Sequence, residues 1–298
     1  MSTAMIASPC TGICKLDETT GWCLGCGRSG EEIAVWGMEA PAWRDSIWAE
    51  IPQRLSDMGV VCQRLPWSSD DIRRFVVRSL ESSSGTWVMG VVGAVAEFTA
   101  KPGADVSVRQ EGDTIVAKTD GGALSMRIDD SVRAMTFDPV STPENRVRIV
   151  LAVKRERGRL PMADGVSDLG EDTGALIASD GGDIFDLGLG RKEARFCVRV
   201  AQGKAREALE AVSGLGLAQS LPSMGPALLS ESPTRVVETA LGRTEVQGPI
   251  AVPGGPTPSG PHTHLLPDHL ATMRAMPVSM DLPRAYLPGA IFYPRQDG

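Results

Sequence analysis

The stretch VSVRQEGDTIVAKTDGGALSMRI, residues 106–128, indicates the fold class of the larger part of the chain. Apolar residues alternate with polar ones through three short runs, which is the pattern of strands that bury one face. The runs are separated by Glu111-Gly112-Asp113 and by Asp120-Gly121-Gly122, two combinations that favour tight turns. We therefore predict three consecutive antiparallel strands, whose apolar positions are Val106, Val108, Ile115, Ala117, Leu124, Met126 and Ile128.

Strand patterns continue beyond this stretch, and helical patterns lie on both sides of it. Apolar residues at helical spacing predict helices near residues 41–55 and 69–80, and a third helix over 204–212 that ends at Gly214. Short apolar or alternating runs predict further strands at residues 132–137, 147–153, 184–189 and 194–200.

The composition changes near residue 85. All six tryptophans lie within the first 87 residues, and the serine-glycine run at 82–85 favours a boundary. We therefore expect an α+β protein in which a small helical module with a four-cysteine metal site (1–58) and a helical linker (59–84) precede a β-rich domain with a few helices (85–298).

Charge and hydropathy exclude several classes of partner. A formal net charge of -7 disfavours binding to nucleic acid, which depends on cationic surface. The longest apolar run, Trp87–Ala96, is too short to span a bilayer, and the first ten residues lack the features of a secretory signal. We therefore expect a cytoplasmic protein with no membrane partner, in which clustered cysteines are metal ligands or redox thiols rather than disulfides.

Four of the six cysteines fall within SPCTGICKLDETTGWCLGCGRSG, residues 8–30. Three residues separate Cys10 from Cys14 and two separate Cys23 from Cys26, so two short loops can each offer two thiolates to one ion or cluster. Gly25 and Gly27 suit a tight metal-binding turn, because glycine tolerates positive φ angles. Four unrelated buried thiols, or two disulfides, are the alternative to a metal site.

Residues 8–58 resemble a bacterial domain of unknown function, DUF1289, whose pattern is close to SPC, CxxD, GxCxGCGR and EIxxW. Members of that family are described as predicted iron-sulfur proteins, so the resemblance implies a metal site with no established reaction. Four thiolates accept either an iron-sulfur cluster or Zn²⁺, and the spacing does not decide between them. The rest of the chain resembles no characterised enzyme family.

All three histidines lie in PHTHLLPDHL, residues 261–270. A step of two residues places His262 and His264 on one side of an extended chain, and a short helix after Pro267 could carry His269 close to them. Three imidazoles could then bind a divalent ion. The alternative is that these are polar loop residues that hydrogen-bond to the backbone and fix the loop rich in proline and glycine before them.

Three functions follow, the third of which is an electron carrier or redox sensor that uses an iron-sulfur cluster; the other two are of different class. The first is a metal-binding protein of unknown biochemical role, accessory or ligand-binding, whose partner is an unknown small molecule or protein. The second is a metal-dependent enzyme that acts on a small molecule at the histidines; the sequence does not decide whether the protein is an enzyme. Cys197 is a minor candidate for a reactive thiol, because Arg195 and Arg199 alternate onto the same face and neighbouring cations lower the pKa of a thiol. The favoured alternative is a partly covered small side chain, since no base is identifiable near it.

Overall fold

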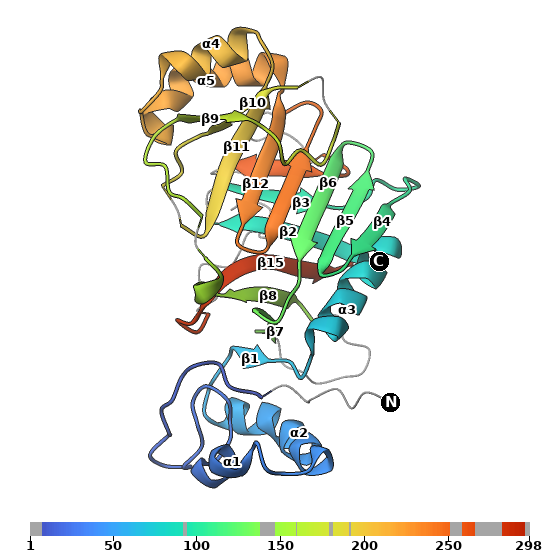
Figure 1. Cartoon of the computed structure of the whole chain (residues 1–298), viewed down its shortest axis with the longest axis vertical. Coiled ribbons are helices and arrows are strands. Elements are labelled where there is room, and N and C mark those ends of the chain that lie inside the picture. Colours follow the sequence, from blue (N-terminus) through green and yellow to red (C-terminus); the bar gives the residue numbers. More distant parts are fainter. Residues whose placement is uncertain are drawn as a thin grey trace.

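A computed structural model describes most of the chain, with short gaps between the described segments. It confirms the α+β class, since two helices at the amino end precede two antiparallel sheets (Figure 1). The described segments are residues 8–91, 94–137, 147–158, 160–178, 181–190, 192–250, 258–265 and 282–295.

The amino-terminal module contains α1 (Gly30–Val35) and α2 (Pro41–Asp57). Helix α1 begins with a capping box, in which the Ser29 side chain accepts from the Glu32 backbone and the Glu32 carboxylate accepts from the Ser29 backbone. The module has a small core of its own, formed by one residue after α1 and one face of α2: Trp36, Ile47, Trp48, Ile51 and Leu55.

The first sheet has seven strands drawn from distant parts of the chain. Strand β15 lies between β8 and β2, so that Phe292 stands opposite Trp87 on one side and Ile149 on the other. The order across this sheet is β1 (Gln63–Arg64), β7 (Val132–Thr136), β8 (Ile149–Lys154), β15 (Tyr286–Pro294), β2 (Gly85–Val91), β3 (Ala94–Phe98) and β14 (His262–Leu265).

The second sheet has eight strands and contains the three predicted consecutive strands as β4, β5 and β6. Ile115 pairs with Gln110 on one side and with Met126 on the other, which confirms the predicted antiparallel arrangement. The order is β4 (Ser107–Glu111), β5 (Thr114–Thr119), β6 (Gly122–Arg127), β13 (Gly242–Val246), β12 (Thr234–Thr239), β11 (Ala194–Val200), β10 (Asp183–Asp186) and β9 (Ser167–Glu171).

The two sheets pack face to face, and their strands run in different directions (Figure 1). The largest buried side chains of this interface include Trp87, Met89, Ile115, Leu124, Met126 and Phe196. Helix α3 (Ser69–Glu81) packs beside the sheets, where the Ser79 hydroxyl accepts from Trp87 Nε1 at 3.0 Å. Helices α4 (Lys204–Ala211) and α5 (Leu217–Glu231) lie at the end of the molecule farthest from the amino-terminal module. A short 3₁₀ helix, η1, spans Arg155–Arg157.

The β1 edge of the first sheet lies toward the amino-terminal module (Figure 1), and the face of this sheet that is turned away from the second sheet is its outer face. This face is apolar, with Met135, Val150, Ala152, Tyr286 and Ile291 buried on it. Arg64 of β1 reaches from the sheet to the cysteine loops, where Nη1 donates to the Cys10 carbonyl oxygen at 3.0 Å. Among the described residues, no helix is both long enough and apolar enough to cross a membrane.

Candidate metal centre and adjoining cavity

The two cysteine loops are packed against each other. The Thr11 hydroxyl, between Cys10 and Cys14, donates at 2.9 Å to the carbonyl oxygen of Gly25, which lies between the other two cysteines. A Cβ atom added to Gly25 would lie 2.6 Å from Thr11 Oγ1 and 2.7 Å from Ile13 Cβ. The loops therefore approach as closely as a glycine allows.

Cys23 and Cys26 form a tight turn of the kind that holds two sulfurs together. The amides of Cys26 and Gly27 donate to the Cys23 carbonyl oxygen at 3.2 and 2.8 Å. Gly27 has a φ of 67°, which confirms the expected positive angle at that residue. Gly25 has no positive φ, and a glycine is needed there because the neighbouring atoms leave no room for a Cβ. The two side chains share a hydrogen bond, which lowers the pKa of the Cys23 thiol to about 5 and, with burial, raises the pKa of Cys26.

The guanidinium of Arg28 is a buried cation that lies beside this pair of sulfurs. Its side chain is almost enclosed, with 4% of the residue exposed, and its Nε donates to Cys26 Sγ at 3.4 Å. The guanidinium also lies over the Trp36 ring, 4.6 Å from its centre. Arg28 forms no ion pair with a carboxylate of the described residues, so its charge faces sulfur. Such a cation stabilises thiolates over thiols.

The other two cysteines lie at the edge of this arrangement. Cys10 is half-buried and its sulfur accepts from the Gly12 amide at 3.4 Å, while Cys14 is exposed. All six cysteines are free thiols. Within the segments that the structure describes, no three ligand-type side chains are grouped for an ion, so the structure brings Cys23 and Cys26 together and leaves Cys10 and Cys14 on the adjacent loop. The loops are interlocked at Gly25, and the guanidinium of Arg28 contacts the sulfur of Cys26.

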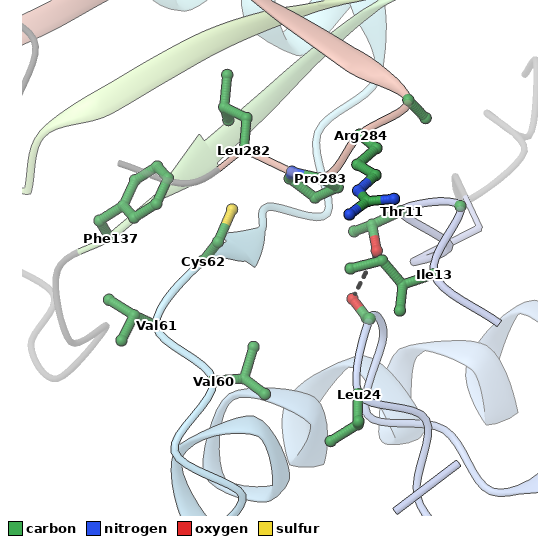
Figure 2. A pocket seen from close by; sticks show the side chains of 13 residues that line it. Thr11, Ile13, Leu24, Val60, Val61, Cys62, Phe137, Leu282, Pro283 and Arg284 are labelled. Carbon is green, nitrogen blue, oxygen red and sulfur yellow. Dashed lines mark hydrogen bonds between the residues drawn. The ribbon is translucent and has the colours of Figure 1, made fainter. Parts of the chain in front are cut away.

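A cavity of about 850 Å³ lies between the cysteine loops and the outer face of the first sheet (Figure 2). Thr11, Ile13, Leu24 and Gly25 of the cysteine loops form one wall. The opposite side is mainly apolar and consists of Val60, Val61, Cys62, Phe137, Leu282, Pro283, Arg284 and Ala285. Burial raises the pKa of the Cys62 thiol to about 12, so this sulfur is a neutral part of the lining. The sequence offered no signal for the cavity, whose walls come from segments more than 200 residues apart.

The structure describes one of the three histidine side chains. His262 begins β14 and is buried; its Nδ1 donates to the Gly260 carbonyl oxygen at 2.7 Å, and its Nε2 lies 3.6 Å from Glu97 Oε2. His264 lies on the same strand, which agrees with the expected extended chain. Its side chain is not among those that the structure describes. His269 lies outside the described residues. The contacts of His262 are those expected of a histidine that fixes the preceding loop.

Cys197 is not an activated thiol. It is fully buried on β11 beside Ile184 and Val236. Burial, reinforced by the nearby carboxylates of Asp186 and Glu238, raises its pKa, and this outweighs the cationic neighbours that the sequence indicated. The expectation of a lowered pKa was therefore wrong, because it counted charges on the strand and omitted the carboxylates of adjacent strands.

Two family models match the chain. One is described as a family of unknown function, DUF6925, and matches residues 71–297; the other is described as a protein of unknown function, DUF1289, and matches residues 8–55. The second match confirms the resemblance drawn from the cysteine pattern. No curated protein and no solved structure matches the chain.

Proposed function

Since the chain belongs to the DUF6925 family through residues 71–297 and inherits no activity from it, we propose a role from its own residues: a metal-binding protein whose thiolate centre supports a ligand cavity. The centre is an iron-sulfur cluster or Zn²⁺ held by Cys10, Cys14, Cys23 and Cys26. The bound metal would supply folding free energy to the module and, as a cluster, a redox centre.

The contact between Arg28 and Cys26 carries the proposal. A buried guanidinium costs free energy unless a negative charge lies beside it. Arg28 Nε lies 3.4 Å from Cys26 Sγ, and among the described carboxylates none pairs with it. Four thiolates on a divalent ion carry a net charge of about -2, which a buried arginine partly balances. Four neutral thiols would leave this cation with only the Trp36 ring and the more distant Glu32 carboxylate, which is already paired with Arg54.

The cavity gives the module a second role. Its residues Thr11, Ile13 and Gly25 form part of the cavity wall, so anything that fixes the cysteine loops also fixes that wall. The volume of about 850 Å³ and the mainly apolar lining suit a small, largely apolar molecule. In this proposal the metal is structural for the binding site, and the β-rich part supplies the opposite side.

Metal analysis of anaerobically prepared protein, with an absorbance spectrum, tests the proposal. We expect one centre per chain: visible absorbance with iron and sulfide indicates a cluster, and a colourless zinc-loaded preparation indicates Zn²⁺. The double substitution Cys23→Ser, Cys26→Ser should abolish metal binding, whereas Cys62→Ser, at a cysteine outside the set, should leave it unchanged. Full metal content in the double variant would overturn the assignment.

The same measurement distinguishes the alternative of a metal-dependent enzyme. A second equivalent of metal that is lost in the His262→Asn, His264→Asn, His269→Asn variant would favour a site at the histidines. One equivalent in both proteins supports the thiolate centre alone. We favour the thiolate centre because both nitrogens of His262 already face Gly260 and Glu97.

A further inference from the structure

Arg235 is a cation placed in the interior of the β-sandwich. It lies on β12 opposite Val198 of β11 and Val246 of β13, both of which are core residues, and it is 3% exposed. Its Nη1 donates to the carbonyl oxygens of Pro233 and Gly248 at 3.1 and 2.6 Å. Its Nε is buried and has no hydrogen-bond partner in the described part of the chain.

No carboxylate of the described residues pairs with Arg235, which distinguishes it from its neighbour Arg199. Arg199, on the adjacent strand β11, is equally buried but forms ion pairs with Asp172 at 2.8 Å and with Glu245 at 3.1 Å. Burial lowers the pKa of Arg235 to about 10, and no charged group of the described residues raises or lowers this pKa further. The group remains charged at neutral pH, so a buried positive charge stands without a counterion from the described residues.

This charge lines a cavity of about 390 Å³ at the edge of the sandwich. Lys101 and His262 line the same cavity, and the neighbouring polar side chains are Gln247 and Ser259. Asp120 also lies on the lining, where its carboxylate pairs with Lys101 Nζ at 2.6 Å on the exposed side. The cavity is therefore lined by two cations, Arg235 and Lys101, and its acidic group is already paired with Lys101.

We propose that this cavity binds the oxyanion of a small molecule, a phosphate or a carboxylate group, with Arg235 as its main cationic contact. The two carbonyl oxygens occupy Nη1 of the guanidinium, and no acceptor in the described part of the chain bonds Nη2, while Nε is buried. Arginine donates strong, charge-assisted hydrogen bonds to oxyanions, so Nη2 is the group that would meet an anion in the cavity. The site is separate from the cysteine loops, so anion binding there does not depend on the proposed metal centre.

Calorimetric titration of the full-length protein with inorganic phosphate, and separately with sodium acetate, tests the proposal at constant ionic strength adjusted with chloride. We expect saturable binding of one of the two anions, and a rise in the thermal midpoint that chloride does not produce. A stronger response to phosphate identifies a phosphate group, and a stronger response to acetate identifies a carboxylate. The substitution Arg235→Gln should weaken binding by about tenfold or more.

Two further variants separate a specific site from a general effect of charge. Arg109→Gln removes an exposed arginine on β4, away from the cavity, and should leave the affinity unchanged. Lys101→Gln removes the rim cation without disturbing the core, so it tests the site even if Arg235→Gln fails to fold. Absence of saturable binding in the wild type, equal losses in Arg235→Gln and Arg109→Gln, or unchanged affinity in Lys101→Gln would each overturn the proposal.

Discussion

The hydroxyl of Thr11 and the carbonyl oxygen of Gly25 are joined by a hydrogen bond of 2.9 Å that closes the two cysteine loops onto each other (Figure 2). Thr11 is almost completely buried, with 1% exposed, although it is a polar residue in a loop. The contact is made by residues between the cysteines, so it sets how closely the two sulfur pairs can approach. It also forms part of the cavity wall, and it therefore couples the metal centre to the proposed ligand site.

Substitution of Gly25 by alanine tests this coupling. The new Cβ would lie 2.6 Å from Thr11 Oγ1 and 2.9 Å from the Ile13 carbonyl oxygen, so the loops must separate. We expect a loss of about 1–3 kcal/mol in the stability of the module and a lower metal content per chain, measured by denaturant unfolding and by elemental analysis. Gly37→Ala is the matched control, because nothing lies within 4 Å of its added Cβ. Equal metal content in both variants would contradict the role of the close approach.

Substitution of Arg28 by glutamine tests the charge beside the sulfurs. The variant loses the contact with Cys26 and the stacking on Trp36, so the thiolate centre loses a cation from its surroundings. We expect the affinity for metal to fall by about 10–100-fold in a competition assay with a chelator. Lys15→Gln removes an exposed positive charge from the same module and should change the affinity little. A similar fall in both variants would mean that net charge, rather than the Arg28 contact, is responsible.

Substitution of Ser79 by alanine tests the attachment of α3 to the sandwich. The indole Nε1 of Trp87 is buried and donates to Ser79 Oγ at 3.0 Å, so removal of the hydroxyl leaves a buried donor without that acceptor. We expect a loss of about 1–3 kcal/mol in the free energy of unfolding, measured by urea denaturation. Ser82→Ala removes a comparable hydroxyl at the end of the same helix, where water can replace its bond to the Arg78 carbonyl oxygen, and should have little effect. Equal losses in the two variants would contradict a specific role for the buried bond.

The sequence predicted those parts of the fold in which local pattern and environment agree. The strands β5 and β6 and the helix α3 each bury the apolar face that the pattern predicts, whereas Val108 of β4 is only half-buried. The hairpin of β12 and β13 escaped prediction because Arg235 is buried at a position where an alternating pattern expects an apolar residue. Strand β15 pairs with β2, more than 200 residues earlier in the chain, and such pairing leaves no mark in the local sequence.

The candidate site, like the fold, was predicted from the sequence only in part. The cysteine spacing indicated which residues form the two loops, and the tight turn at Cys23 and Cys26 follows from it. The role of Arg28 was not predicted, since a single arginine after a cysteine has no distinctive pattern. The cavities could not be predicted, because their walls depend on how the module meets the sheet and on where buried charges lack partners.

Asp172 provides a test of the buried charges on the other face of the second sheet. Its carboxylate has an exposed fraction of 3% and accepts hydrogen bonds from Arg199 and Arg243. Burial by itself would raise the pKa of Asp172, but the two guanidinium groups outweigh it and the pKa is lowered. A lowered folded-state pKa means that the ionised carboxylate contributes stability above the unfolded-state value of about 3.9, and that this contribution is lost as the pH falls through the folded-state pKa.

The variant Asp172→Asn should therefore be less stable than the wild type by about 1–3 kcal/mol at pH 7, because two buried guanidinium groups lose one charged partner and keep Glu245. The difference should begin to shrink as the pH falls below about 3.9, where the unfolded chain gains its proton, and should close as the pH falls through the lowered folded-state pKa. Urea unfolding at a series of pH values between 7 and 3 measures this difference directly. Glu111→Gln, at an exposed carboxylate 3.8 Å from Arg109, should match the wild type throughout. A difference for Asp172→Asn that stays constant with pH would show that packing or lost hydrogen bonds, rather than the ionised carboxylate, account for the destabilisation.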